Sequence, residues 1–372
     1  MKTLLLGTRK GLIVLERGAR GDWRIAREAH LGTPVVYADV DPRTGWLYAS
    51  MDHGHWGQKL ARSRDGGETF ADVPAPKYPE GEVVKDNVGG GDMRPATLRL
   101  IWVFAPGGRD EPQRCYLGTE PGGLFRSDDG GASFDLVRPL WDHPSRIERW
   151  FGGGRDLPAI HSVCVDPRDS RHVHVGISCA GVFETKDGGE SWEPRNQGLA
   201  ADFLPDPKVE VGHDPHFLAR CEAEPDVLWQ QNHCGIFRST DGARTWQDVS
   251  EPKGKGPARF GFPIAADERD PERAFVVPAI DDETRVAVGR ALCVCRTEDG
   301  GKTWTAFRAG LPQEACYDIV FRHGLAKSGD RLAFGSTTGN VFVSDDRGES
   351  WRSLGSHFPP VYSVRFVRAA AS

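Results

Sequence analysis

The sequence contains no long hydrophobic run and no cluster of basic residues. Its apolar stretches fall well short of the roughly 18 residues that a membrane-spanning helix needs, and near the N-terminus only three leucines stand together before Gly7. We therefore expect neither a signal peptide nor a membrane segment. With 47 Lys and Arg against 53 Asp and Glu, the net charge is −6. This balance argues against nucleic acid and anionic membranes as partners.

The sequence also lacks a disulfide framework and the common nucleotide-binding motifs. Eight cysteines are scattered between Cys115 and Cys316 without regular spacing, so we expect reduced thiols and a cytoplasmic location. Two glycine triplets, at 89–91 and 152–154, lack the strand and helix that flank phosphate-binding loops. We therefore expect no nucleotide cofactor. Both triplets end long insertions, which favours loops that approach a ligand.

Turn residues, large aromatic residues and one repeated motif are abundant. The 45 Gly and 26 Pro indicate many turns, and 11 Trp with 18 Phe supply side chains for a core. The motif reads Ser/Thr-x-Asp, a pair that is usually Gly-Gly, then x-Ser/Thr and Trp or Phe. It recurs about every 56 residues, at 63–70, 127–134, 185–192, 239–246, 297–304 and 344–351.

Each copy of the motif ends a larger repeat. Its Asp can accept hydrogen bonds from the backbone amides of a tight turn, and its glycines permit positive φ. Upstream of most copies lie short apolar runs separated by turns, and the aromatic residue opens one more. A helical pattern is confined to residues 144–151. The pattern predicts four short strands per repeat and an all-β chain.

Four-stranded repeats of this kind are typical of β-propellers. A decayed copy of the motif at 16–23 brings the number of repeats to seven. The N-terminus starts partway through a repeat, and residues 359–367 resemble the strand that this repeat lacks. We therefore predict a single domain, residues 1–372, with seven four-stranded blades. The C-terminal strand should close the ring by joining the N-terminal blade.

At the six motifs the sequence resembles the Asp-box (BNR) repeat proteins of the sialidase-like β-propeller superfamily. The resemblance implies the propeller fold and a structural role for the motifs at the rim. Its implications for function are broad, because members range from sialidases and other glycosidases to sorting receptors and photosystem assembly factors. Sialidases use an arginine triad and a tyrosine nucleophile, and their Phe/Tyr-Arg-Ile-Pro motif is absent here. Candidates for the two roles are Arg94, Arg155 and Arg259, and Tyr37, Tyr317 and Tyr362.

Histidines gather where a propeller usually binds its ligands. The loop leading into each inner strand and the loop between the second and third strands open on one face, around the central channel. Six of the 12 histidines fall on these loops. Four belong to two neighbouring blades and are candidate ligands of one divalent transition metal (Zn, Mn, Fe or Cu): His161, His213, His216 and His233. Alternatively, they are hydrogen-bonding histidines that line a wet channel.

The same loops carry residues suited to proton transfer and to anion binding. Candidates for proton transfer are Tyr317, Asp214 and Asp156. Candidates for substrate binding are Arg155, Arg94, Arg259, His55 and Glu120.

Together these residues predict a hydrolase or lyase that acts on a small polar or anionic, sugar-derived substrate at the channel mouth. Two alternatives stay open at this point. One is a metal-free, sialidase-like exo-glycosidase. The other is a binding or assembly propeller without catalysis, which predicts an exposed patch instead of a deep polar funnel.

Overall fold

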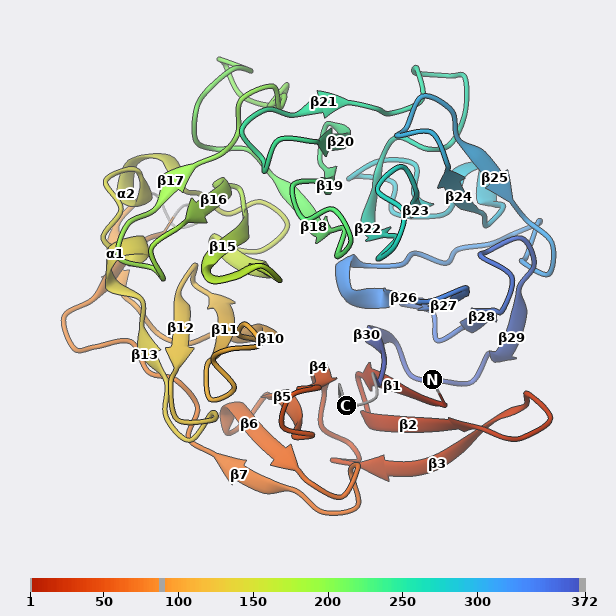
Figure 1. Ribbon diagram of the computed structural model, residues 1–372, viewed down its shortest axis with the longest axis horizontal. Helices are drawn as coiled ribbons and strands as arrows, with labels where there is room; N and C mark the ends of the chain where they lie inside the picture. The colour runs from red at the N-terminus through yellow and green to blue at the C-terminus, as the bar shows by residue number, and fades with distance from the viewer. Residues whose placement is uncertain (1, 87–90, 368–372) are drawn as a thin grey trace.

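The strands form seven four-stranded antiparallel sheets around a central axis (Figure 1). The computed structural model describes residues 2–86 and 91–367. One sheet consists of β4 (Val35–Val40), β5 (Leu47–His53), β6 (Gly57–Ser63) and β7 (Ala71–Val73). The next consists of β10 (Leu100–Pro106), β11 (Cys115–Glu120), β12 (Leu124–Ser127) and β13 (Asp135–Leu136). A third consists of β14 (Ala159–Asp166), β15 (Asp169–Ser178), β16 (Gly181–Thr185) and β17 (Glu193–Pro194). Three more are β18 (Pro215–Arg220), β19 (Leu228–Asn232), β20 (Gly235–Ser239) and β21 (Gln247–Asp248); β22 (Gly261–Ala266), β23 (Ala274–Pro278), β24 (Val294–Thr297) and β25 (Thr305–Phe307); β26 (Leu325–Ser328), β27 (Arg331–Gly335), β28 (Val341–Ser344) and β29 (Arg352–Gly355).

The seventh sheet contains both ends of the described chain. Its order is β3 (Trp23–Ala29), β2 (Gly11–Arg17), β1 (Thr3–Thr8) and β30 (Val361–Phe366). Strand β30 pairs antiparallel with β1, and it also contacts the inner strands of both neighbouring blades, β4 and β26. The predicted seven-bladed propeller and its closure by the C-terminal strand are confirmed (Figure 1).

The repeated motif forms the same turn in all six copies. In the third, Asp187 Oδ1 accepts hydrogen bonds from the Thr185 hydroxyl at 2.7 Å and from the Glu190 and Ser191 amides at 3.0 Å. The Ser191 hydroxyl donates to the second carboxylate oxygen. Two glycines follow the Asp at positive φ, 80° and 99°, which residues with a side chain rarely adopt. The carboxylate therefore satisfies the donors of a turn, as the sequence predicts.

These turns make the fold sensitive to acid. All six motif aspartates have a pKa below the ordinary value. For Asp187 the cause is that the Ser191 and Thr185 hydroxyls and backbone amides donate hydrogen bonds to its carboxylate. A lowered pKa stabilises the folded state above the unfolded pKa of about 3.9, and this contribution is lost as the pH falls through the lower folded-state pKa. We expect urea midpoints to be flat from pH 7 to 5 and to fall steeply below pH 4. Equal midpoints at pH 6 and pH 2 would contradict this role.

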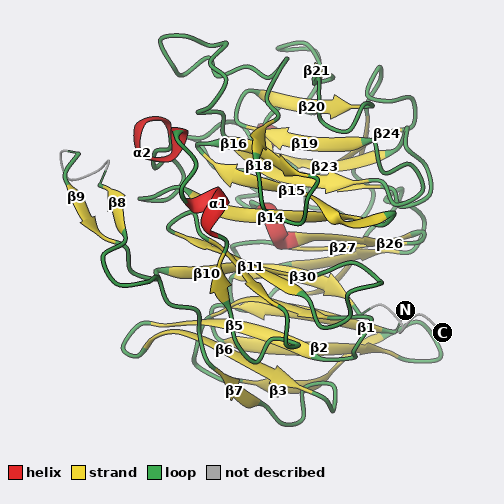
Figure 2. Ribbon diagram, turned by 60° about the vertical axis from the view of Figure 1, so that its left-hand side comes forward, coloured by secondary structure: helices red, strands yellow, loops and turns green. Residues whose placement is uncertain are grey.

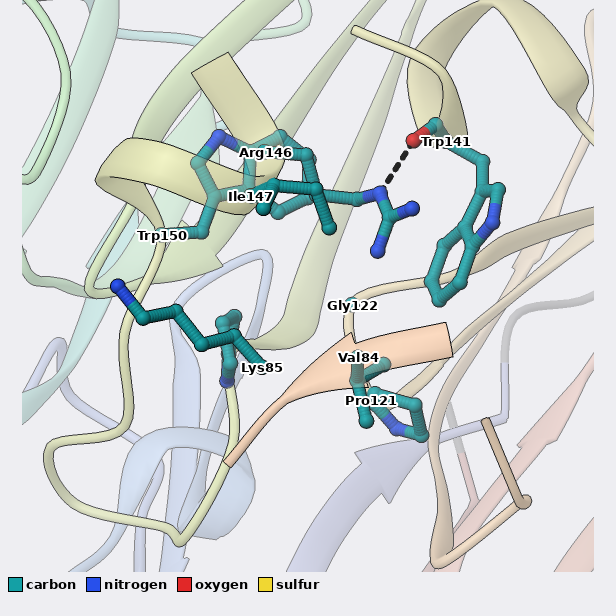
Figure 3. A pocket seen from close by; sticks show the side chains of 9 residues that line it. Val84, Lys85, Pro121, Gly122, Trp141, Arg146, Ile147 and Trp150 are labelled. Carbon is teal, nitrogen blue, oxygen red and sulfur yellow. Dashed lines mark hydrogen bonds between the residues drawn. The ribbon is translucent and has the colours of Figure 1, made fainter. Parts of the chain in front are cut away.

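Two insertions pack together on one side of the ring. The first contains the hairpin β8 (Val83–Lys85) and β9 (Met93–Pro95), and the second contains α1 (Arg138–Trp141) and α2 (Ser145–Arg149) (Figure 2). A small pocket between them has a volume of about 20 Å³, and beside it Arg146 donates to the Trp141 carbonyl (Figure 3). This space holds at most a water molecule or two. Residues 89 and 90 of the first glycine triplet lie outside the described residues.

In the described residues, regular helix is otherwise limited to two short 3₁₀ turns, η1 (Val288–Arg290) and η2 (Arg322–Gly324). None of the helices in the described part of the chain is long and apolar enough to cross a membrane. Large aromatic side chains of the blades, such as Trp229, Phe183 and Phe334, are fully buried, as is Trp141 of α1. The blades thus form a rigid frame, and the loops that reach the axis build the site.

Candidate functional site

A cavity of about 470 Å³ opens at the mouth of the central channel. Both sets of loops expected to meet on this face contribute to it. Arg9 follows β1 and Asp52 lies near the end of β5, whereas Arg155 and Arg322 precede the inner strands β14 and β26. The size is typical of a site for a small molecule or a short saccharide.

Three of the predicted site residues converge beside this cavity. Asp214 Oδ2 lies 3.4 Å from His216 Nε2 and 3.7 Å from His233 Nδ1. One donor atom from each of the three residues lies within 4.8 Å of the others. Asp214 Oδ1 accepts hydrogen bonds from the Ser178 hydroxyl at 2.9 Å and the Cys179 amide at 3.2 Å. These bonds fix the carboxylate with Oδ2 toward the two imidazoles.

In this cluster a lone pair of His216 faces the Asp214 carboxylate. His216 Nδ1 lies 2.6 Å from the Gly261 carbonyl oxygen and must donate to it. Burial lowers the pKa of His216, so at neutral pH the ring is neutral and its Nε2 lone pair faces Asp214. Burial alone would raise the pKa of Asp214, but the positive charge of Arg322 acts in the opposite direction, and the pKa lies below its ordinary value. An ionised carboxylate beside the lone pair of an imidazole is an arrangement suited to a cation or a shared proton.

Two predicted metal ligands lie outside this group. The His213 ring points away from it, with Nε2 2.7 Å from the Val209 carbonyl and Nδ1 3.4 Å from the Ala200 carbonyl. His161 is fully buried, and its ring packs edge-on against Trp102. Within residues 2–86 and 91–367, no cluster of three metal-binding side chains includes either histidine. The prediction of four histidines on one metal must therefore be corrected.

The predicted substrate-binding residues divide into two sets. Arg155 lines the cavity and forms an ion pair with buried Glu120. Arg94 instead pairs with Asp86 at 2.7 Å on the β8–β9 hairpin. Arg259 donates to the Glu251 carbonyl at 3.3 Å, and exposed His55 packs against the neighbouring Trp56. None of these last three residues lines the cavity, so their predicted role is not supported by their position.

The other two predicted proton-transfer residues are also outside the cavity. Tyr317 is 56% exposed. The neighbouring Asp318 is buried and accepts hydrogen bonds from Thr338 and Asn340. Asp156 is largely exposed and forms a loose ion pair with Arg99 at 3.4 Å. Of the three candidates for proton transfer, Asp214 alone lies in the cluster.

Several residues at the mouth were not identified from the sequence. Arg322 and His323 form the short turn η2 just before β26, and Trp102 lies on β10. The apolar stretch after Asp318 resembles the start of an inner strand, but the strand begins only at Leu325. Because the strand starts late, Arg322 lies just before it at the channel mouth, where the sequence predicts Tyr317.

A second cluster of metal-binding side chains has a structural explanation. His172, His174 and Glu184 lie together in the blade formed by β14–β17. Glu184 also pairs with Arg195 at 2.6 Å, and His172 lies 3.1 Å from Asp166, which is itself paired with Arg220. These groups already neutralise one another, so the cluster is a polar network within the fold.

Comparison with known proteins supports the fold and suggests a direction for function. No protein-family model matches the sequence. An oligoxyloglucan-reducing end-specific xyloglucanase from Emericella nidulans is 25% identical over 313 aligned residues, which cover 75% of this chain and 34% of that protein. The chain thus spans about a third of the length of this curated relative.

Two solved structures share the propeller fold. A GH74 xyloglucanase from Xanthomonas campestris superposes with a TM-score of 0.64 at 16% identity, over 94% of this chain and 52% of that one. YCF48 from Cyanidioschyzon merolae superposes with a TM-score of 0.53 at 13% identity, over 88% and 87%. At these identities the likeness establishes a β-propeller and leaves the function to the site.

Proposed function

We propose that this chain is a hydrolase that acts on a carbohydrate at the mouth of its central channel. The observation that carries the proposal is the sequence relationship to a xyloglucan-degrading enzyme, which extends over three quarters of this chain. The 470 Å³ cavity at the mouth has the size for a short saccharide. A pure assembly propeller, the alternative class, gives no reason for a cavity of this size lined with charged groups.

Three carboxyl groups at or near the mouth are our candidates for the groups that glycoside hydrolysis requires. Most glycosidases use two carboxyl groups, one to protonate the leaving group and one to activate water or attack the sugar. Asp52 lines the cavity, Glu120 lies behind it in an ion pair with Arg155, and Asp214 lies beside it. We assign Asp214 to the side of the attacking water, because its pKa lies below the ordinary value and it stays ionised, as a metal ligand must.

We also propose that Asp214, His216 and His233 bind one divalent transition metal. The support is their donor set of two imidazoles and a carboxylate, together with the unprotonated His216 Nε2 that faces Asp214. When bound, such a metal would lower the pKa of a water molecule and polarise the substrate. The Ser178 hydroxyl and the Cys179 amide hold the Asp214 carboxylate in place, and the Gly261 carbonyl holds the His216 ring.

Two further assignments belong with this proposal. The six identical turns support membership of the Asp-box repeat proteins. All eight cysteines are free, and Cys293 and Cys295 keep their sulfur atoms 3.9 Å apart without a disulfide. Reduced thiols support a cytoplasmic location.

A hydrolysis screen tests the proposed function. The purified protein, supplied with Zn²⁺, Mn²⁺ or Fe²⁺ in turn, is incubated with nitrophenyl glycosides, nitrophenyl uronides and short oligosaccharides that include xyloglucan fragments. We expect at least one substrate class to release sugar, as followed by mass spectrometry. The matched control is the Asp128→Asn variant, which changes an exposed carboxylate at a rim turn. No hydrolysis of any class by a folded, metal-supplied protein would overturn the proposal.

A further inference from the structure

Arg322 is a buried cation without a partner. The residue is 7% exposed, and the Nε and Nη2 atoms of its guanidinium have no hydrogen-bond partner among the described residues. No carboxylate in residues 2–86 and 91–367 lies within ion-pair distance of it. Burial lowers the pKa of Arg322 to about 10, so the group is still charged at neutral pH. Leaving a buried charge unpaired destabilises a protein, which suggests a functional reason for it.

Aromatic rings hold this guanidinium in place without satisfying its N–H donors. Its central carbon lies 4.9 Å from the centre of the Trp102 ring and 5.5 Å from that of Phe262. Contacts with ring faces orient a cation and leave its in-plane donors free for another ligand. Asp214 lies nearby but is already committed, because Oδ1 accepts from Ser178 and Oδ2 faces the imidazoles.

Most of the charged side chains in the cavity wall are positive. Four arginines line it, Arg9, Arg155, Arg285 and Arg322, against the single carboxylate of Asp52. Two of the four have partners, since Arg155 pairs with Glu120 and Arg285 donates to the Asp282 carbonyl at 2.7 Å. A cavity wall with this excess of positive charge attracts anions.

We propose that the substrate of this site is an anionic sugar and that Arg322 binds its carboxylate or phosphate group. The inference rests on the proposed carbohydrate hydrolase and names the substrate class that this function would act on. A guanidinium presents two parallel N–H donors that match the two oxygens of a carboxylate or phosphate. Phe262 packs against the His216 ring, with centroids 4.7 Å apart, and also against Arg322, whose charge acts on both Asp214 and His216. The anionic group would thus be held next to the groups that carry out the reaction.

The test measures binding, so it does not depend on hydrolysis. Titration calorimetry is run with glucuronate, glucose 6-phosphate and glucose on the wild-type protein, Arg322→Met and the control Arg94→Gln, whose arginine lies outside the cavity. We expect glucuronate or glucose 6-phosphate to bind wild type and the control at least about tenfold more tightly than glucose does, and Arg322→Met to lose this preference. The stronger of the two anions identifies carboxylate or phosphate as the group bound.

Thermal unfolding separates a binding role from a structural one. Without ligand, Arg322→Met should unfold at the same temperature as wild type or higher, since it removes an unpaired buried charge. If the variant fails to fold, the salt dependence of wild-type binding serves instead, and glucuronate affinity should fall with added NaCl while glucose affinity stays constant.

Equal affinity for glucuronate, glucose 6-phosphate and glucose, or an unchanged preference in Arg322→Met, would overturn the inference. So would a salt-independent affinity for both anions. Binding of an anion by a protein that hydrolyses no glycoside would leave the anion site standing and overturn only the proposed hydrolase. Hydrolysis of neutral glycosides without preference for charged ones would support the proposed hydrolase and overturn the anion site.

Discussion

Replacing Asp214 with asparagine is expected to lower kcat by a factor of about 10²–10⁴, the range for loss of an acid–base group. The substitution keeps the shape of the side chain and leaves Oδ1 able to accept from Ser178 and the Cys179 amide. It removes the negative charge that faces His216 and His233. Metal content measured by inductively coupled plasma mass spectrometry should fall with activity, from about one equivalent to about a tenth of that.

The control for this variant is the Asp128→Asn protein used in the hydrolysis screen. Asp128 pairs with Arg114 at 2.6 Å in an exposed position outside the cavity, and its loss should change neither activity nor metal content. An Asp214→Asn protein with wild-type kcat would remove Asp214 from the reaction. Activity lost without any change in metal content, in a protein that binds metal, would assign Asp214 to proton transfer and the metal to other residues.

Removing β30 is expected to abolish the cooperative folding of the whole ring. The strand buries Val361, Val364 and Phe366, each worth about 1.5–3 kcal/mol on burial. Their sum approaches the total stability of an ordinary domain, about 5–15 kcal/mol. Its loss also opens the contacts of β30 with β1, β4 and β26. A chain that ends at Pro360 should show no cooperative transition in urea followed by circular dichroism.

A peptide of residues 359–367 added to the shortened chain serves as the control for this deletion. Because β30 pairs with β1 over the register Leu4↔Phe366 to Thr8↔Val361, the peptide should restore a cooperative transition. A shortened chain that unfolds at the wild-type urea concentration would show that closure of the ring contributes little to stability.

The sequence was sufficient to predict the propeller because its information is local and repeated. Each Ser/Thr-x-Asp motif forms its turn with donors two to four residues away, as around Asp187. The strands between the turns then have little choice of partner, since short connections favour neighbours along the chain. The pairing of β1 with β30, which joins the two ends of the described chain, followed from counting the strands that each repeat needs.

The site was predicted only in part because it depends on side-chain direction and on the exact start of a strand. The register of β18 shifts between Pro215 and Phe217, so simple alternation does not place His216. Alternation does separate His213 from Asp214, since successive residues of an extended chain point to opposite sides, and this could have been read from the sequence. The position of Arg322 could not, because an apolar stretch after Asp318 precedes β26 without joining its sheet.

The convergence at the mouth also crosses blades that lie far apart in sequence. Trp102, Phe262 and Arg322 come from β10, β22 and η2 and meet only because the ring closes. No local motif marks such residues. These three residues have in common that they are polar or aromatic and lie near the start of an inner strand. Many residues with a purely structural role have the same character and position.

A crystal structure of the protein with bound glucuronate tests most directly whether the channel mouth is where this propeller binds and processes its ligand. We expect the sugar in the 470 Å³ cavity, with its carboxylate on the Arg322 guanidinium and its ring within reach of Asp214 and Asp52. Glucuronate bound at the outer rim with the cavity filled only by water would contradict this assignment.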